Sequence, residues 1–268
     1  MTTVCLIGVP TDCNSSYLRG PAAAPAHIRA ALRSDSGNPA TELGGELGSD
    51  IALLDTGDLP LTESAADDAL IEAAVTRALQ AGHAPLLLGG DHSITSAVMR
   101  AFARHYPQLS ILHFDAHPDL YHELQGNPRS HASPFARIME EQLVQRLVQV
   151  GIRTMNAHQR SQAARFGVEV VAMQGFAPER VPRIAGPLYI SVDLDGLDPA
   201  FAPGVSHHEP GGLSVRQLLE VLSRVEPGQV VGGDVVELNP ARDLNGMTAV
   251  VAAKIVKELA ALMARRSP

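Results

Sequence analysis

Short apolar runs alternate with helical patterns from one end of the chain to the other. The runs are rich in Val, Ile and Leu, and several are almost wholly apolar, as expected for strands that are covered on both faces of a sheet. We count about eight runs. They occupy residues 4–9, 51–54, 85–88, 110–114, 147–150, 168–171, 188–192 and 230–236. This alternation predicts an α/β fold built on a mostly parallel sheet.

The segments between the runs carry apolar residues at helical spacing. One such stripe runs from Leu70 to Leu79, and Gly82 is placed to end that helix. Ser214 can cap another helix, and the last helix has its stripe at 251–262. We interpret these stripes as core. The Gly- and Pro-rich stretches are short, so they predict loops within one domain and not linkers.

Composition narrows the class of protein. The 268 residues, 45% of them hydrophobic, fit one large domain, which we expect to span residues 1–268. A net charge of −8 argues against a nucleic-acid or anionic-membrane partner, because both need a basic surface. Two cysteines are too few for a disulfide framework, and the opening segment has no signal-type pattern, so we expect a cytoplasmic protein.

Candidate chemistry follows two of the apolar runs directly. The motifs are Asp115-Ala-His117-Pro-Asp119 and Asp193-Leu-Asp195. A strand sends residues i, i+2 and i+4 to one face, so the side chains of each motif can converge. Clustered carboxylates repel one another, and a multivalent cation offsets that cost. Either motif alone also fits a surface turn, but the two together predict a binuclear metal site.

Further candidate ligands stand at other strand ends. Residues 89–93, Gly-Gly-Asp-His-Ser, end the third run and place His92 on a strand-to-helix turn, and Glu237 follows the last run. The carboxyl ends of neighbouring parallel strands form a ligand crevice, so these side chains can meet the two acidic motifs there. An oxygen-rich donor set with imidazole and no thiolate favours Mn(II), although Fe, Co and Ni also fit. Two such ions would lower the pKa of a shared water enough to supply hydroxide near neutral pH.

Three nearby residues receive a structural interpretation. We interpret His113 as a packed or hydrogen-bonded histidine that points to the other face of its strand from Asp115. Asp91 and Asp198 are interpreted as bracing the turns around the ligands.

Motifs along nearly the whole chain together match one family. They lie at residues 14–16, 20–22, 89–93, 115–119, 126–127, 130–133, 150–153, 191–195, 198–199, 202–207, 209–212 and 236–240. Through them the chain resembles the ureohydrolases, the arginase and agmatinase family, and looks closest to the plant-type arginases. The resemblance implies a three-layer αβα fold with a central, mostly parallel eight-stranded sheet. It also implies two Mn(II) ions per chain, a small guanidino substrate, and a homo-oligomer, either a trimer or a hexamer.

The same resemblance assigns roles to the metal ligands. Asp115 and Asp193 would bridge the two ions. His92 and Asp119 would complete one metal site, and His117 and Asp195 would complete the other. Asp119 would also pass a proton to the departing amine.

The resemblance implies roles for two residues that are not ligands. His131 would be the proton shuttle, a task suited to a group that titrates near neutrality. Glu237 would hold the guanidinium, because a carboxylate facing a planar cation forms a charge-assisted fork. Asn127 and Ser133 are our candidates for binding the carboxylate of the substrate.

Several functions therefore remain open. The leading prediction is hydrolysis of L-arginine to L-ornithine and urea. The alternative is hydrolysis of agmatine to putrescine and urea, or of another guanidino acid, because residues 154–156 lack the acidic side chain by which animal-type arginases recognise the amino group. A mononuclear zinc deacetylase of related fold, or a catalytically silent metal-binding homologue, is less favoured, since no ligand of either metal site is missing.

Overall fold

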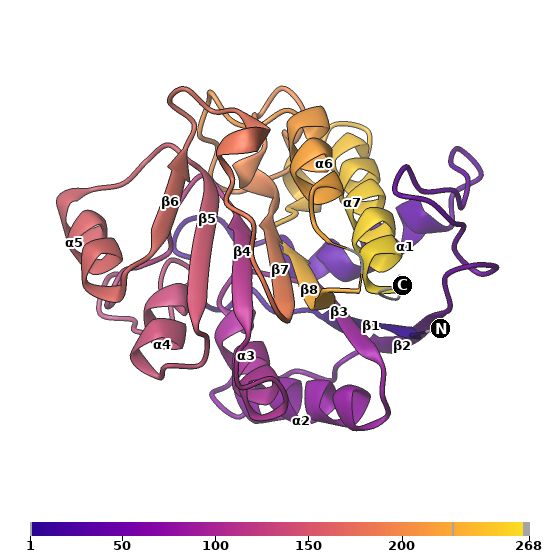
Figure 1. Cartoon of the computed structure of the whole chain (residues 1–268), viewed down its shortest axis with the longest axis horizontal. Helices are drawn as coiled ribbons and strands as arrows, with labels where there is room; N and C mark the ends of the chain where they lie inside the picture. Colours follow the sequence, from indigo (N-terminus) through magenta and orange to yellow (C-terminus); the bar gives the residue numbers. More distant parts are fainter. Residues whose placement is uncertain (1, 227, 265–268) are drawn as a thin grey trace.

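Eight parallel strands form one sheet through the centre of the molecule (Figure 1). The computed structural model describes residues 2–226 and 228–264. Across the sheet the strand order is β2-β1-β3-β8-β7-β4-β5-β6, and every pairing is parallel. The strands are β1 (Val4–Val9), β2 (Leu53–Asp58), β3 (Ala84–Gly89), β4 (Ser110–Phe114), β5 (Arg146–Ile152), β6 (Glu169–Ala172), β7 (Leu188–Asp193) and β8 (Val230–Val236).

Each of the eight apolar runs overlaps one of these strands. The largest difference is at β2, which begins two residues later than predicted and continues through polar residues to Asp58. β2 is an edge strand that pairs only with β1, and its residues alternate between half-buried and exposed. An edge strand tolerates polar side chains, so its hydrophobic pattern is a weak guide to its ends.

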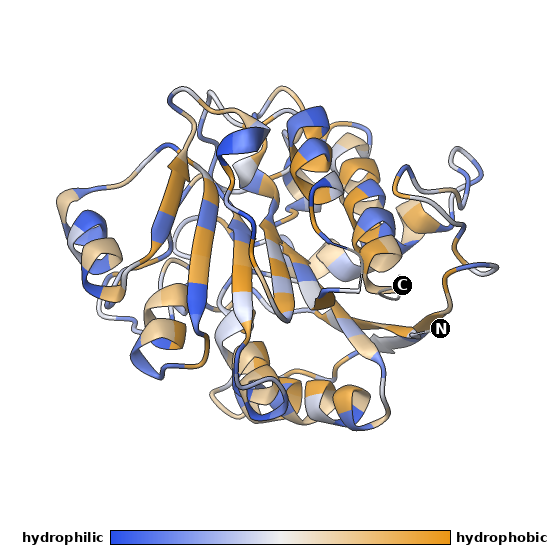
Figure 2. Ribbon diagram, in the orientation of Figure 1, coloured by the Kyte–Doolittle hydropathy of each residue, from blue (hydrophilic) through white to orange (hydrophobic). Residues whose placement is uncertain are grey.

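Helices cover both faces of the sheet, which confirms the predicted three layers. α1 (Ala24–Leu32), α6 (Val215–Ser223) and α7 (Met247–Ala264) pack with the strands into one core. On the other face α2 (Asp67–Gln80), α3 (Ile94–His105), α4 (Pro134–Glu140) and α5 (Ala157–Phe166) pack into a second core. Figure 2 shows that hydrophobic colour dominates the central strands and that hydrophilic colour gathers on outer helix turns.

Local signals set the ends of these helices. The Ser214 hydroxyl accepts a hydrogen bond from the Gln217 N–H at 3.1 Å, so α6 begins at the predicted cap. α2 ends at Gln80 with Ala81 as its C-cap, and Gly82, the predicted stop, follows in the left-handed region at φ 74°. Among residues 2–226 and 228–264, no helix combines the length and the apolar character needed to cross a bilayer.

The turn after β3 depends on close backbone contact with the turn after β1. Gly90 N–H donates to the Val9 carbonyl, and Asp91 N–H donates to the Thr11 carbonyl, both at 2.9 Å. A Cβ at Gly90 would overlap the Thr11 backbone. Only glycine therefore lets the two turns approach this closely, and this contact fixes the turn that carries His92.

We expect Gly90→Ala to destabilise the protein by about 1–3 kcal/mol, because the turn must shift to accommodate the methyl group. Chemical denaturation measures this change. Gly37→Ala is the matched control, since a Cβ there would be 3.9 Å from its nearest neighbour, the Ser34 carbonyl oxygen. Equal stability of the two variants would contradict the close contact.

Candidate metal centre

The predicted ligands meet at the carboxyl ends of four adjacent strands. His92 follows β3, the 115–119 motif follows β4, the 193–195 pair ends β7, and Glu237 follows β8. These strands are neighbours in the order β3-β8-β7-β4. Since parallel strands all end at the same edge, the four segments reach one crevice.

The predicted ligands form two metal-ligating groups at this edge, and His113 forms a third group with His92 and Asp115. His92, Asp115, Asp119 and Asp193 form one group, and Asp115, His117 and Asp195 form the other, with the atoms of each group within 4.8 Å of one another.

In the first group, His92 Nδ1 is the central atom. It lies 3.1 Å from Asp193 Oδ2, 3.2 Å from Asp119 Oδ2 and 3.4 Å from Asp115 Oδ2. The second group is arranged around His117. Its Nδ1 lies 3.1 Å from Asp195 Oδ2 and 3.4 Å from Asp115 Oδ1.

Asp115 belongs to both groups and presents a different oxygen to each. This is the arrangement expected of a bridging ligand. Asp193 contacts only the first group, because its other oxygen accepts the backbone N–H of Asp195 at 2.8 Å. The second bridge, through Asp193, stays a prediction.

The charges of this cluster fit a divalent cation. All four carboxylates are at most 6% exposed. Burial, together with Asp195 and Asp115, raises the pKa of Asp193 well above its usual value. Burial lowers the pKa of His117, but Asp195 and Asp115 outweigh it and raise that pKa to about 12. These pKa shifts reflect the concentration of buried negative charge, which a cation would offset, and the oxygen and imidazole donors suit a hard or borderline metal.

Two residues of the site have strained backbones. Asp119 has φ 49° and Glu237 has φ 67°, values that non-glycine residues rarely adopt. Such strain costs on the order of 1–3 kcal/mol per residue and is concentrated at functional sites. Glu237 directly follows β8, and Asp119 lies in the turn that follows β4, at the edge of the sheet where the ligands meet.

A polar chain behind His92 fixes its orientation. Ser191 Oγ donates to Asp234 Oδ1 at 2.6 Å and lies 2.9 Å from His92 Nε2. Because its only proton goes to Asp234, Ser191 must accept from His92 Nε2–H, which leaves Nδ1 to face the carboxylates. The sequence reasoning missed Ser191 and Asp234. The sequence feature that could have identified them is a polar residue inside each of two otherwise apolar runs, those at 188–192 and 230–236.

His113 is also tied to the cluster, and the prediction that it points away from Asp115 is wrong. Its Nε2 lies 2.8 Å from Asp115 Oδ2. Residues two apart on a strand share a face, so the spacing itself placed the two side chains together. Gln149 Nε2 donates to Pro118 O at 2.7 Å and lies 3.1 Å from His113 Nδ1. Burial lowers the pKa of His113, and the neutral ring donates from Nε2 to the shared ligand.

The two aspartates assigned to turns do brace them. Asp91 accepts from the backbone N–H groups of Asn14 and Ser93. Asp198 accepts from the N–H groups of Ala200, Gly211 and Gly212.

A second titratable pair adjoins the ligands. His131 Nδ1 lies 2.8 Å from Glu237 Oε1, and the same oxygen accepts the backbone N–H of His92 at 2.9 Å. Burial lowers the pKa of His131, but Glu237 outweighs it and raises that pKa to about 9. Ser16 Oγ lies 2.9 Å from His131 Nε2. His131 therefore stands between a buried carboxylate and a hydroxyl, as a proton relay requires.

The ligands and His131 open onto a cavity of about 200 Å³. Its lining residues are Ser16, His117, Asp119, Tyr121, Leu124, His131, Ala132, Thr154, Asn156, Gln159, Asp193, Asp195 and His207. His207 was not predicted. Burial and the neighbouring His131 lower its pKa to about 4, so it contributes a neutral imidazole to the cavity wall.

Comparison with known proteins agrees with this geometry. The model of the Arginase family matches residues 2–262. The chain belongs to the arginase family. Arginase 1, mitochondrial, of Oryza sativa subsp. indica is 49% identical over 280 residues, which are 98% of this chain and 82% of that protein. An agmatinase of Bacillus anthracis is 34% identical over 264 residues, covering 96% of this chain and 90% of its own.

Solved structures of the family share the fold. The arginase from Medicago truncatula superposes with a TM-score of 0.90 at 45% identity, covering 98% of this chain and 87% of that chain. The predicted ureohydrolase resemblance and the αβα fold are both confirmed. The paired ligand groups are consistent with a binuclear metal site in this arginase-family chain.

Neither of the two residues predicted to bind the substrate carboxylate lines the cavity. Asn127 Nδ2 donates to Asn14 Oδ1 at 3.1 Å, while its carbonyl oxygen accepts the N–H of Arg129. Ser133 is fully buried at the start of α4, and its hydroxyl has no hydrogen-bond partner among the described residues. Substrate binding by either residue stays a prediction.

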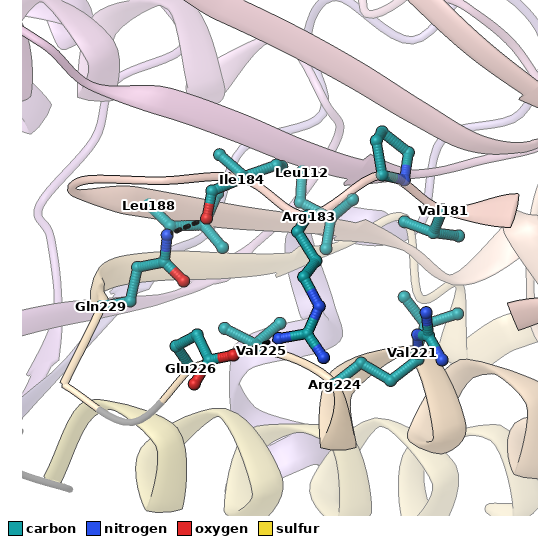
Figure 3. Close-up of a pocket in the computed structure, with 11 residues that line it drawn as sticks. Leu112, Val181, Arg183, Ile184, Leu188, Val221, Arg224, Val225, Glu226 and Gln229 are labelled. Carbon is teal, nitrogen blue, oxygen red and sulfur yellow. Dashed lines mark hydrogen bonds and ion pairs between the residues drawn. The ribbon is translucent and has the colours of Figure 1, made fainter. Parts of the chain in front are cut away.

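Another hollow lies at the opposite ends of the strands. Figure 3 shows it between the 181–188 segment and the end of α6, lined by apolar side chains with Arg183, Arg224 and Glu226. Leu188, the first residue of β7, borders it, so the length of that strand separates it from Asp193. Its arginine and glutamate side chains do not form a metal-ligating group.

We expect Ser191→Ala to weaken metal binding about 10- to 100-fold, because His92 loses the acceptor that fixes its ring. Titration calorimetry with Mn(II) on metal-stripped protein measures this loss. Thr95→Val is the matched control: it removes a 2.8 Å hydrogen bond to the same Asp234 and leaves the Ser191–His92 contact. Equal loss of metal affinity in both variants would contradict a specific role for the Ser191–His92 contact.

Proposed function

We propose that this chain is a binuclear manganese amidinohydrolase that converts L-arginine to L-ornithine and urea. The observation that carries the proposal is Asp115 shared between two ligand groups on a cavity that His131 also lines. The identity with plant arginases, 45–49%, exceeds that with the agmatinase. Both relatives are named for hydrolases of guanidino compounds, which supports the same C–N bond chemistry here.

Glu237 is suited to hold the guanidinium. Its Oε1 already accepts from His92 N–H, and His131 adjoins it. Within the described residues the hydrogen bonds of Glu237 fall on Oε1, so Oε2 is left for the substrate. A buried carboxylate paired with a planar cation orients the guanidinium carbon toward the metal ligands.

The ligand set favours manganese. Four carboxylates, two imidazoles and no thiolate select Mn(II) over the softer ions, with Co, Ni or Fe as substitutes. Held by these ligands, two divalent ions would supply a water of lowered pKa, so that hydroxide would be present near neutral pH.

Proton transfer falls to Asp119 and His131. Burial and Asp115 raise the pKa of Asp119, so this carboxyl can take up a proton and release it to the departing amine. The His131 ring then exchanges protons with the cavity through Nε2, next to Ser16. Both side chains line the cavity, within reach of a bound substrate.

Agmatine is the second candidate substrate. The agmatinase relative supports it, as does the neutral side chain of Asn156 in the cavity wall. Other guanidino acids rank third. A mononuclear deacetylase and a silent homologue are disfavoured by the two ligand groups, in which every predicted ligand is present.

We also propose a homo-oligomer, a trimer or a hexamer, in the cytoplasm, with no nucleic-acid or membrane partner. Leu244, Met247 and Val250 expose apolar side chains around the start of α7, which supports burial against another copy. The acidic net charge supports the proposal that nucleic acid and anionic membranes are not partners. The two unpaired cysteines support a cytoplasmic location. Light scattering of the purified protein tests the assembly, and a monomer would contradict it.

We expect the Mn-loaded protein to release urea from L-arginine faster than from agmatine or 4-guanidinobutyrate. Asp119→Asn should lower the arginine rate by about 100-fold or more, because a proton-transfer group is lost. A urea assay measures both. Asp35→Asn, at an exposed loop position, is the control and should keep full activity. An active Asp119→Asn enzyme, or no urea from any substrate, would refute the proposal.

A further inference from the structure

Away from the metal ligands and histidines, the cavity is lined by uncharged side chains. Apart from the metal ligands and the two histidines, its lining residues are Ser16, Tyr121, Leu124, Ala132, Thr154, Asn156 and Gln159. None of these is a lysine or an arginine. A carboxylate at the end of an amino-acid substrate must therefore be recognised by neutral hydrogen-bond donors.

The orientation of one of these side chains, Asn156, is fixed by a helix cap. Asn156 is the N-cap of α5, and its Oδ1 accepts the backbone N–H of Gln159 at 2.9 Å. Gln159 Oε1 accepts the Asn156 N–H in return, at 3.2 Å. This capping box commits the amide oxygen to the helix, so the Nδ2 group must point the other way.

Asn156 Nδ2 points at the Tyr121 hydroxyl. It donates a hydrogen bond to that oxygen at 2.6 Å. The Tyr121 ring also stacks on His158 of α5, with ring centroids 5.8 Å apart and planes at 14°. Since the hydroxyl oxygen accepts from Asn156, its own proton is directed elsewhere and is available to an acceptor in the cavity.

We propose that Tyr121, oriented by Asn156, is the residue that recognises the carboxylate of the amino-acid substrate. This inference rests on the proposed arginine hydrolysis. A phenol hydrogen bond to a carboxylate is charge-assisted, and a hydroxyl, unlike a cation, does not repel the ammonium group beside that carboxylate. Agmatine has no carboxylate and gains nothing from this contact. Tyr121 therefore determines specificity and takes no part in bond cleavage.

The position of Tyr121 suits this role. It lies two residues after Asp119, and both side chains line the same cavity. The hydroxyl is thus fixed by α5 on one side and by a metal-ligating segment on the other. Asn127 and Ser133, the earlier candidates, are engaged with Asn14 and buried at the start of α4, respectively.

Two substitutions test the inference on the full-length, Mn-loaded protein. Tyr121→Phe removes only the hydroxyl and keeps the ring on His158. Asn156→Asp keeps a cap for α5, but its second oxygen would accept the Tyr121 proton and so withdraw the donor from the cavity. Tyr106→Phe is the matched control, because Tyr106 lies at the far end of α3. Metal content confirms that each variant is loaded.

For Tyr121→Phe we expect KM for L-arginine to rise about 10-fold or more, with kcat nearly unchanged, because the lost contact binds substrate and transition state alike. Asn156→Asp should match or exceed this rise. The kinetic constants for agmatine should stay at the wild-type values in Tyr121→Phe, and Tyr106→Phe should behave as wild type with both substrates. An equal loss for arginine and agmatine, or an unchanged KM for arginine, would overturn the inference.

Product binding separates this inference from the proposed reaction. Calorimetry should show that wild-type protein binds L-ornithine more tightly than putrescine. Tyr121→Phe should weaken ornithine binding about 10-fold or more and leave putrescine binding unchanged. This result needs no turnover, so a protein that released no urea would refute the reaction and still test Tyr121. Equal affinity of the wild type for the two amines would show that no carboxylate is recognised.

Discussion

Repulsion among four buried carboxylates is the constraint on which this structure depends. Asp115, Asp119, Asp193 and Asp195 lie at the ends of two adjacent strands and are almost fully shielded from water. Charges of one sign at such distances persist inside a protein only when protons or cations neutralise them. The parallel sheet forces the encounter, because the same edge receives the ends of β4 and β7. A cluster that costs stability in this way is the arrangement expected of a site for cations.

The surrounding residues hold the ligands in place against that repulsion. Behind one imidazole, Ser191 and Asp234 lie inside otherwise apolar strands and fix the ring of His92. Behind the shared carboxylate, Gln149 fixes His113, which in turn contacts Asp115. Each of these side chains is fully buried and makes at least one hydrogen bond, so the core itself orients the site. The residues that orient the ligands thus lie in the strands and not in the loops.

Sequence reasoning located the strands and the ligands because both follow simple rules of periodicity and of parallel-sheet topology. It failed where a side chain is placed by partners far away in the chain. The wrong interpretation of His113 had a different cause, because it ignored the two-residue spacing that places His113 and Asp115 on one face. The 120–133 segment has no periodicity, and its course depends on contacts with Asn14 and with α5. A bond such as that between Asn156 and Tyr121, 35 residues apart, leaves no local signal in the sequence.

The most direct test of this account is a crystal structure of the Mn-loaded protein in which anomalous scattering counts and locates the ions. The account predicts two manganese ions per chain, with one oxygen of Asp115 on each ion and with His92 and His117 on different ions. A single ion, or two ions that do not share Asp115, would contradict it.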